Sequence, residues 1–227
     1  MEFSRYALYF APPEGADWTR LATAWLGWDM ETGAEVAPPE APGIDVAGIT
    51  ERPRKYGLHG TIKPPFRLAG GRSPAELMAA AEALCARLKP VTLDGLGLAR
   101  MGGFLALRPE GDANALSDLA AACVEGLDDF RAPAPEAELE QRRKAGLSPA
   151  QEAHLQRWGY PYVMDQFRFH ITLSRRLSDD EAAPAEAWLR EHLDPMLPRP
   201  FHIPDMALVG EGPDGRFRMI HRYTLSG

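Results

Sequence analysis

The strongest constraint on the fold is an order of predicted elements that occurs twice along the chain. An alternating segment at 56–66 precedes a helical pattern and two strand patterns, and an alternating segment at 167–174 precedes the same series. The spacing agrees as well, because His59 precedes Asp94 by 35 residues and His170 precedes Asp205 by the same interval (59 to 94 and 170 to 205). We interpret this order as an internal repeat of strand, helix, strand, strand.

Helix starts and strand ends are marked by local signals. The segments beginning at Ser73, Ser148 and Ser178 each place a Glu or Gln three residues later, which is the signature of a capping box. The run RYALYFAP (5–12) is typical of a strand, and Asp17 to Trp28 of a helix. We expect residues 33–55, which hold four prolines and no periodicity, to form a long loop that ends in a basic cluster.

Both alternating segments place histidine and threonine on one strand face. Successive side chains of a strand point to opposite faces, so YGLHGTIKPPF (56–66) puts His59, Thr61 and Lys63 together, and we expect its two prolines to end it. In FRFHITLS (167–174) the polar face likewise holds Arg168, His170, Thr172 and Ser174, opposite an aromatic and aliphatic face. Two such strands facing one cleft would bring the His-x-Thr pairs together.

These residue types suit the hydrolysis of a cyclic phosphodiester. The reaction needs a base that takes a proton from water and an acid that protonates the departing oxygen, and histidine can do either near neutrality. The hydroxyls of Thr61 and Thr172 can hydrogen-bond the non-bridging oxygens of the phosphate. We expect His59, His170, Thr61 and Thr172 to be catalytic, and Lys63 and Arg168 to bind the anion.

Two other functions use the same residues. A non-catalytic module could hold a phosphorylated ligand or an RNA end in the same cleft, and turnover would separate it from an enzyme. A metallohydrolase could join the two histidines through a metal, with Asp165 or Asp205 as a third ligand. The chain lacks close ligand pairs such as His-x-x-x-His or Cys-x-x-Cys, and its polar faces offer hydroxyls and cations, so we expect neither a metal nor another cofactor.

The composition restricts the classes of molecule that the protein is expected to bind. The 227 residues are 45% hydrophobic and 25% charged with a net charge of −7, which disfavours a long nucleic acid but allows a local cluster of cations that binds a small anion. We expect a small phosphorylated substrate. The start lacks the pattern of a signal peptide, and no stretch approaches the length of a membrane span, so we expect a cytoplasmic protein with no membrane contact. The oligomeric state stays open.

The motifs HGTI (59–62) and HITL (170–173) resemble the paired His-x-Thr/Ser motifs of the 2H phosphoesterase superfamily, which includes RNA 2′,3′-cyclic phosphodiesterases and 2′–5′ RNA ligase-like proteins. The strings RYALYFAP, YGLHGTIKPPF and FRFHITLSRRL resemble a narrower branch associated with phosphonate metabolism. The resemblance extends from the first predicted strand to the last.

This resemblance implies a bilobal α+β fold with two pseudo-symmetric strand-helix-strand-strand lobes around a central cleft. We expect one domain over 1–227, with lobe 1 at about 1–127, a helical connection at about 128–165 and lobe 2 at about 166–227. It also implies metal-free phosphodiester chemistry by the two histidines, on a cyclic phosphorylated sugar or nucleotide. The helical connection exceeds what a bare core of this kind requires, and its role stays open.

Overall fold

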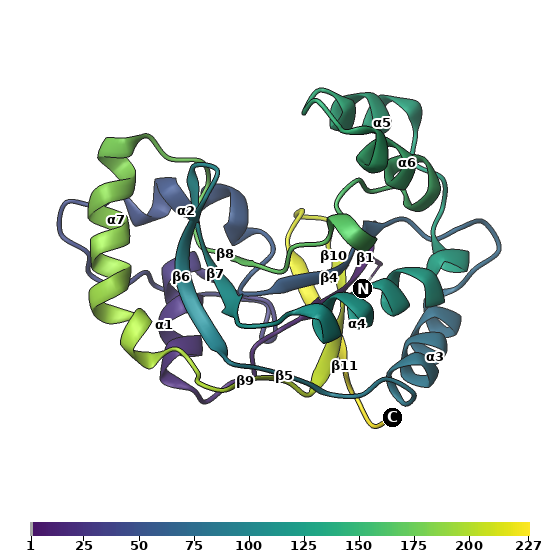
Figure 1. The fold of residues 1–227 in the computed structure, drawn as a ribbon, viewed down its shortest axis with the longest axis horizontal. Coiled ribbons are helices and arrows are strands. Elements are labelled where there is room, and N and C mark those ends of the chain that lie inside the picture. The colour runs from purple at the N-terminus through teal and green to yellow at the C-terminus, as the bar shows by residue number, and fades with distance from the viewer. Residues whose placement is uncertain (1) are drawn as a thin grey trace.

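The computed structural model describes residues 2–227 and is built on one antiparallel seven-stranded sheet (Figure 1). The strands lie in the order β11-β10-β1-β4-β8-β7-β6. Their bounds are β1 (Tyr6–Phe10), β4 (Gly60–Phe66), β6 (Gly95–Met101), β7 (Phe104–Glu110), β8 (Ile171–Thr172), β10 (Asp205–Glu211) and β11 (Phe217–Thr224). Two short pairs lie outside this sheet: β2 (Trp28–Asp29) with β3 (Ala34–Glu35), and β5 (Val91–Leu93) with β9 (Phe201–Ile203).

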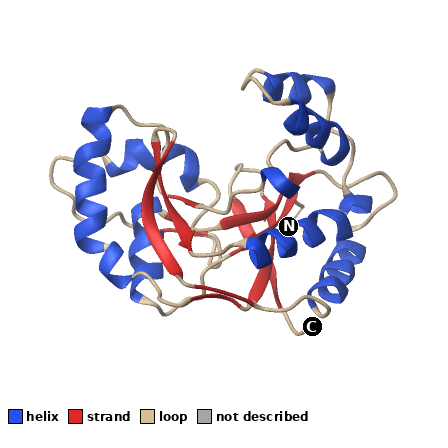
Figure 2. Cartoon of the chain, viewed as in Figure 1, coloured by secondary structure: helices blue, strands red, loops and turns tan. Residues whose placement is uncertain are grey.

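In the view of Figure 2 the helices form two groups, one on the left and one on the right. They are α1 (Asp17–Leu26), α2 (Val46–Arg54), α3 (Pro74–Cys85), α4 (Asn114–Gly126), α5 (Glu136–Arg143), α6 (Pro149–Trp158) and α7 (Asp179–His192), with single turns η1 (Asp128–Phe130), η2 (Met164–Gln166) and η3 (Asp194–Met196). The three predicted capping boxes are confirmed at the starts of α3, α6 and α7. The mixed α+β class is therefore confirmed.

The two halves of the chain exchange their hairpins. The β6–β7 hairpin of the first half joins β8, whereas the β10–β11 hairpin of the second half joins β1. The helices are exchanged in the same way: α3 of the first half contacts β10 and β11, and α7 of the second half contacts β7. Strands of both halves therefore alternate in the one sheet, and the lobe boundaries stay a prediction. The segments β5 and β9, which lead into the two hairpins, pair with each other (lower edge of Figure 1). This pairing stabilises the exchange.

One face of the sheet carries the main core. Alternate residues of the central strands, such as Leu8, Ile62, Phe169 and Ile171, are buried there among the helices. Trp25 of α1 ties this layer to the second His-x-Thr segment, since its Nε1 donates to the carbonyl of Leu173 at 2.9 Å. The opposite face carries a smaller buried cluster that includes Tyr9, Val209 and Phe217, and Tyr9 of this cluster also lines the cavity described below.

Three local expectations are wrong. Residues 46–54 of the predicted loop form α2, because the Asp45 side chain accepts from the Gly48 amide and caps a helix that the prolines conceal. Strand β4 runs through Pro64 and Pro65 to Phe66. The segment 167–174 keeps its alternating burial up to Leu173, but only Ile171–Thr172 forms a regular strand, and Ser174 is buried. No helix within residues 2–227 combines the length and apolar composition needed to cross a membrane.

Candidate functional site

The pairing of β4 with β8 brings the two His-x-Thr motifs together. Gly60 pairs with Ile171, so in this antiparallel ladder His59 lies opposite Thr172 and Thr61 lies opposite His170. All four side chains point to the face away from Gly60 and Ile171. Directly opposite residues of a ladder have Cβ atoms about 4.5–5.5 Å apart. The register therefore assembles a square of two histidines and two threonines.

Each histidine is anchored in the same way. Nδ1 of His59 donates to the carbonyl of Gly57 at 3.0 Å, and Nδ1 of His170 donates to the carbonyl of Arg168 at 2.9 Å. An imidazole whose Nδ1 is the donor presents Nε2 for proton transfer. The Nε2 of His59 lies 3.2 Å from the hydroxyl of Thr61. The carbonyl two residues before each histidine thus orients the ring, and this contact is not visible in the sequence.

The surroundings of His59 keep it neutral. Its ring lies against that of Tyr9, with centroids 4.0 Å apart, and near that of Tyr56 at 5.5 Å. Burial lowers the pKa of His59 to about 4; the Gly57 carbonyl opposes this shift and the charge of His170 adds to it. His59 is therefore able to accept a proton near pH 7.

The square opens into a cavity of about 890 Å³, within the range that holds a whole small molecule. His59, Thr61 and Thr172 line it. His170 lies beside it, with its ring 5.6 Å from that of Phe104, another residue of the wall. The α5–α6 hairpin reaches the same cavity through Arg142, and the following loop reaches it through Tyr160.

The cavity is basic although the protein is acidic. Its wall holds one carboxylate, Glu51, and six cations: Arg5, Arg52, Lys55, Arg142, Arg175 and Arg176. Arg5, Arg142 and Arg175 are paired with Glu211, Glu138 and Glu181 respectively. The remaining cations favour an anionic ligand.

Lys63 does not lie with the histidines. Leu8 of β1 pairs with Lys63 and Tyr9 pairs with Thr61, so Ile62 is an extra residue in β4 and the alternation reverses. Lys63 is therefore on the core face with Leu8, 2% exposed, where its ammonium donates to the carbonyl of Val124 at 2.8 Å and lies 3.7 Å from Asp128. The face assigned to Lys63 from strict alternation was wrong.

Arg168 is also outside the wall of the cavity. Its Nη1 donates to the carbonyls of Asp165 and Phe167, at 3.0 and 2.6 Å, so the exposed side chain folds back on its own backbone. The alternation of polar and apolar residues predicted the strand face of Arg168. It did not predict the direction of the side chain, because residues 167–170 form no regular ladder. The carbonyl of Arg168 contributes instead, as the acceptor for His170.

Several wall residues were missed in the sequence. Arg175 and Arg176 follow directly on the second motif, and Arg52 and Lys55 belong to the basic cluster before the first, so proximity to the motifs was a usable signal. Arg142 gave no signal. It lies on a helix of charged residues, and such a pattern is typical of a solvated face.

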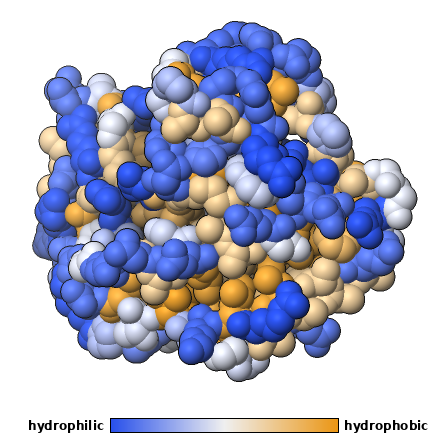
Figure 3. Space-filling model, turned by 45° about the vertical axis from the view of Figure 1, so that its right-hand side comes forward, coloured by the Kyte–Doolittle hydropathy of each residue, from blue (hydrophilic) through white to orange (hydrophobic). Residues whose placement is uncertain are grey.

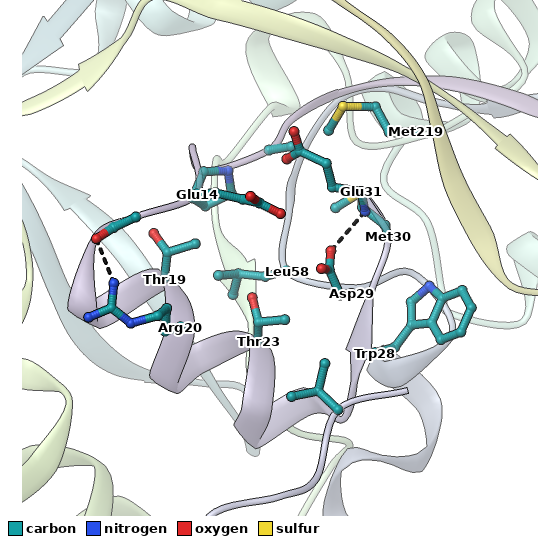
Figure 4. Close-up of a pocket in the computed structure, with 14 residues that line it drawn as sticks. Glu14, Thr19, Arg20, Thr23, Trp28, Asp29, Met30, Glu31, Leu58 and Met219 are labelled. Atoms are coloured by element: carbon teal, nitrogen blue, oxygen red, sulfur yellow. Dashed lines mark hydrogen bonds between the residues drawn. The ribbon is translucent and has the colours of Figure 1, made fainter. Parts of the chain in front are cut away.

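A second cavity, of about 360 Å³, lies between α1 and β2 (Figure 4). Its polar side chains include Glu14, Asp29 and Glu31. These carboxylates disfavour an anion, and the histidines lie elsewhere. We therefore place the candidate site in the larger cavity.

The side chains around the square do not form a metal site. Within residues 2–227, no group of three or more His, Cys, Asp or Glu side chains is arranged to hold a metal ion. The two aspartates considered from the sequence are engaged elsewhere, since Asp205 pairs with Arg222 and Asp165 with His154.

Comparison with known families and proteins gives one family and two named relatives. The model of a family described as "Protein of unknown function (DUF1045)" matches residues 61–218. A protein of Janthinobacterium sp. (strain Marseille) named "Ribose 1,5-bisphosphate phosphokinase PhnN" is 40% identical over 182 residues, which cover 79% of this chain and 40% of that protein. A protein of the same name from Laribacter hongkongensis (strain HLHK9) is 37% identical over 223 residues, 97% of this chain and 52% of that protein. The chain thus spans about half, or less, of the length of these relatives.

Solved structures also align along the whole chain. The crystal structure of TT0787 of Thermus thermophilus has a TM-score of 0.47 at 16% identity, with 98% of each chain covered. The crystal structure of E. coli LigT complexed with phosphate has a TM-score of 0.46 at 14% identity, with 100% of each chain covered. A crystal structure titled as that of a phosphoesterase has a TM-score of 0.43 at 16% identity, again over 100% of each chain.

Proposed function

The chain belongs to the DUF1045 family, and we propose that it is a metal-independent phosphoesterase that hydrolyses a small cyclic phosphate. The observation that carries this proposal is the square in which His59 and His170 face Thr172 and Thr61 across β4 and β8. Two oriented imidazoles on one open face supply both the base and the acid that ring opening requires.

The buried position of His59 supports the role of base for this residue. His59, neutral because its pKa is about 4, takes a proton from a water molecule whose oxygen attacks phosphorus. The bond between phosphorus and one ring oxygen breaks, and a protonated His170 gives its proton to that oxygen. The products are a phosphate monoester and a free hydroxyl, and the proton gained by His59 and lost by His170 is exchanged with solvent.

The threonines stabilise the negative charge that develops on the phosphate oxygens in the transition state. In this proposal, the threonine opposite each histidine in the register donates its hydroxyl to a non-bridging oxygen of the phosphate. Donors of this kind, held in place before the reaction, stabilise the transition state without reorganisation. The surplus of cations in the wall supports an anionic substrate.

We propose a phosphorylated ribose or nucleotide as the substrate and a link to phosphonate metabolism. Two observations support it: the sequence resemblance to a phosphonate-associated branch, and the name of the two relatives, which specifies a ribose bisphosphate. This chain matches only part of each relative, so the kinase activity in that name is not assigned to it.

Turnover by the purified protein tests the proposal. A panel of ribose and nucleoside cyclic phosphates is incubated with the wild type and with His59→Ala and His170→Ala variants, and product is followed by phosphorus NMR. We expect each variant to lose about 10²–10⁴-fold in kcat while keeping its circular dichroism spectrum. Tight binding of the panel without any product would show a binding module instead of an enzyme.

A further inference from the structure

Two buried donors beside the cavity have no hydrogen-bond partner within residues 2–227. They are the hydroxyl of Tyr9 and Nε of Arg142, and both residues belong to the cavity wall. Buried polar groups of native proteins are nearly always paired, with protein, water or ligand. Two unpaired donors in the wall of a basic cavity therefore indicate a group that accepts hydrogen bonds there.

Arg142 carries surplus positive charge to this part of the wall. Its Nη2 donates to Glu138 at 2.8 Å, but the same carboxylate also accepts from Arg67 at 2.9 Å. One carboxylate thus serves two guanidinium groups. The guanidinium of Arg142 lies over the ring of Tyr160, 4.7 Å from its centroid, which holds it against the cavity.

The neighbouring groups are donors as well. Burial raises the pKa of Tyr9 well above its usual range, and the nearby Tyr56 and Tyr160 raise it further while Arg5 opposes this. The Tyr9 hydroxyl therefore stays protonated near neutral pH. Lys55 lies over the ring of Tyr56, 4.6 Å from its centroid. The hydrogen bond from Arg5 lowers the pKa of Glu211, and the charge of Lys55 helps to lower it. The ring of Tyr9 also packs on His59, so this cluster adjoins the square.

We propose that Arg142, Lys55 and Tyr9 form a second anion subsite, the Arg142 subsite, which binds a phosphate group of the substrate other than the one in the ring. The inference rests on the proposed function, because the square is assigned to the cyclic phosphate. It names the substrate class more closely: a cyclic phosphate that carries a further phosphate monoester. It also gives the α5–α6 hairpin a role, since this largely hydrophilic projection (top of Figure 3) brings Arg142 to the cavity.

The other cations of the wall suit this role less well. Arg175 is paired with Glu181, and Nη1 of Arg176 donates to the carbonyl of Gly102. Arg52 is exposed, so solvent screens its charge more than that of a partly buried cation. Arg52 is therefore the competing candidate that the experiment must separate from Arg142.

The test measures affinity, so that it does not depend on hydrolysis. A ribose cyclic phosphate with and without a 5-phosphate is titrated by calorimetry into the His170→Gln protein, which we expect to bind without turnover. We expect the 5-phosphate to strengthen binding at least tenfold. Arg142→Gln in the same background should reduce this advantage to twofold or less and leave the unphosphorylated ligand unaffected, because a lost hydrogen bond to a charged group costs about tenfold or more.

Three further variants complete the design. Arg142→Lys keeps the charge and should keep part of the advantage, while Arg157→Gln removes the same charge from the hairpin outside the cavity and should keep all of it. The proposal is overturned if the wild-type pocket shows no advantage, if the advantage survives Arg142→Gln, or if Arg52→Gln alone removes it. It is also possible to separate the two proposals. If no cyclic phosphate is turned over, but the 5-phosphate strengthens binding and Arg142→Gln removes this gain, the proposed reaction is refuted and the subsite is supported.

Discussion

Gly60 of β4 and Ile171 of β8 pair directly, and the ring of Phe169 lies where a side chain on Gly60 would have to be. A Cβ atom built on Gly60 would come within 2.3 Å of that ring. The absence of a side chain at Gly60 therefore allows the close approach that sets His59 opposite Thr172.

Gly60→Ala should disturb this register. The buried Phe169 ring cannot move freely, so we expect a loss of about 1–3 kcal/mol in the free energy of unfolding. A displacement of about 1 Å at the square should lower kcat by roughly a hundredfold. Urea unfolding and steady-state kinetics measure both effects. The double variant Gly60→Ala/Phe169→Leu should recover part of each, and no recovery would show that the ring is not the obstacle.

The sequence predicted the square better than its surroundings. Alternation and the repeated His-x-Thr placed His59, Thr61, His170 and Thr172 on polar faces, and strand pairing completed the arrangement. Alternation failed at Lys63 because a bulge depends on the partner strand β1, which the sequence of β4 does not contain. The exchange of hairpins was not predicted for the same reason. Local sequence patterns predict strands and helices but not which neighbouring strand each one joins. Arg142 reaches the cavity only through the packing of α5 and α6.

The pH dependence should reflect the low pKa of His59. As pH falls, His59 keeps its neutral form until about pH 4, so the acid limb of kcat/KM should lie well below the ordinary histidine value of 6.5. His59→Gln should remove this limb. His221→Gln, on β11 outside the cavity, is the control that should keep it. An acid limb near pH 6.5 that survives His59→Gln would refute the assignment.

Lys63→Met should change stability but not substrate binding. Because Lys63 is in the core, we expect KM to stay within twofold of the wild-type value. Burial lowers the pKa of Lys63 from 10.5 to about 8, so between these values the unfolded chain retains a proton that the native protein loses. The free energy of unfolding of the wild type should therefore rise with pH over this window relative to Lys63→Met, by up to about 3 kcal/mol. Denaturant titrations of both proteins at pH 7.5 and 10 measure this difference. A tenfold rise in KM in Lys63→Met would show instead that Lys63 contributes to substrate binding.

Chelation should leave the activity unchanged. The square supplies two imidazoles, whereas catalytic zinc sites use three protein ligands, and no group of three His, Cys, Asp or Glu side chains within residues 2–227 is arranged to hold a metal ion. We expect full turnover after incubation with EDTA and gel filtration. Loss of turnover that zinc or manganese restores would replace the acid–base mechanism with a metal-assisted one.

The threonine hydroxyls should contribute to the rate more than to binding. Thr61→Val and Thr172→Val keep the shape of each side chain and remove the donor, so we expect kcat to fall by about 10²–10³-fold at each position, within the range for an oxyanion donor. KM should change less, because the charge on the non-bridging oxygens grows in the transition state. Thr92→Val is the matched control, since Thr92 lies on β5 and contacts His202 outside the cavity. A rise in KM with kcat unchanged in Thr61→Val and Thr172→Val would mean that the hydroxyls bind the ground state only.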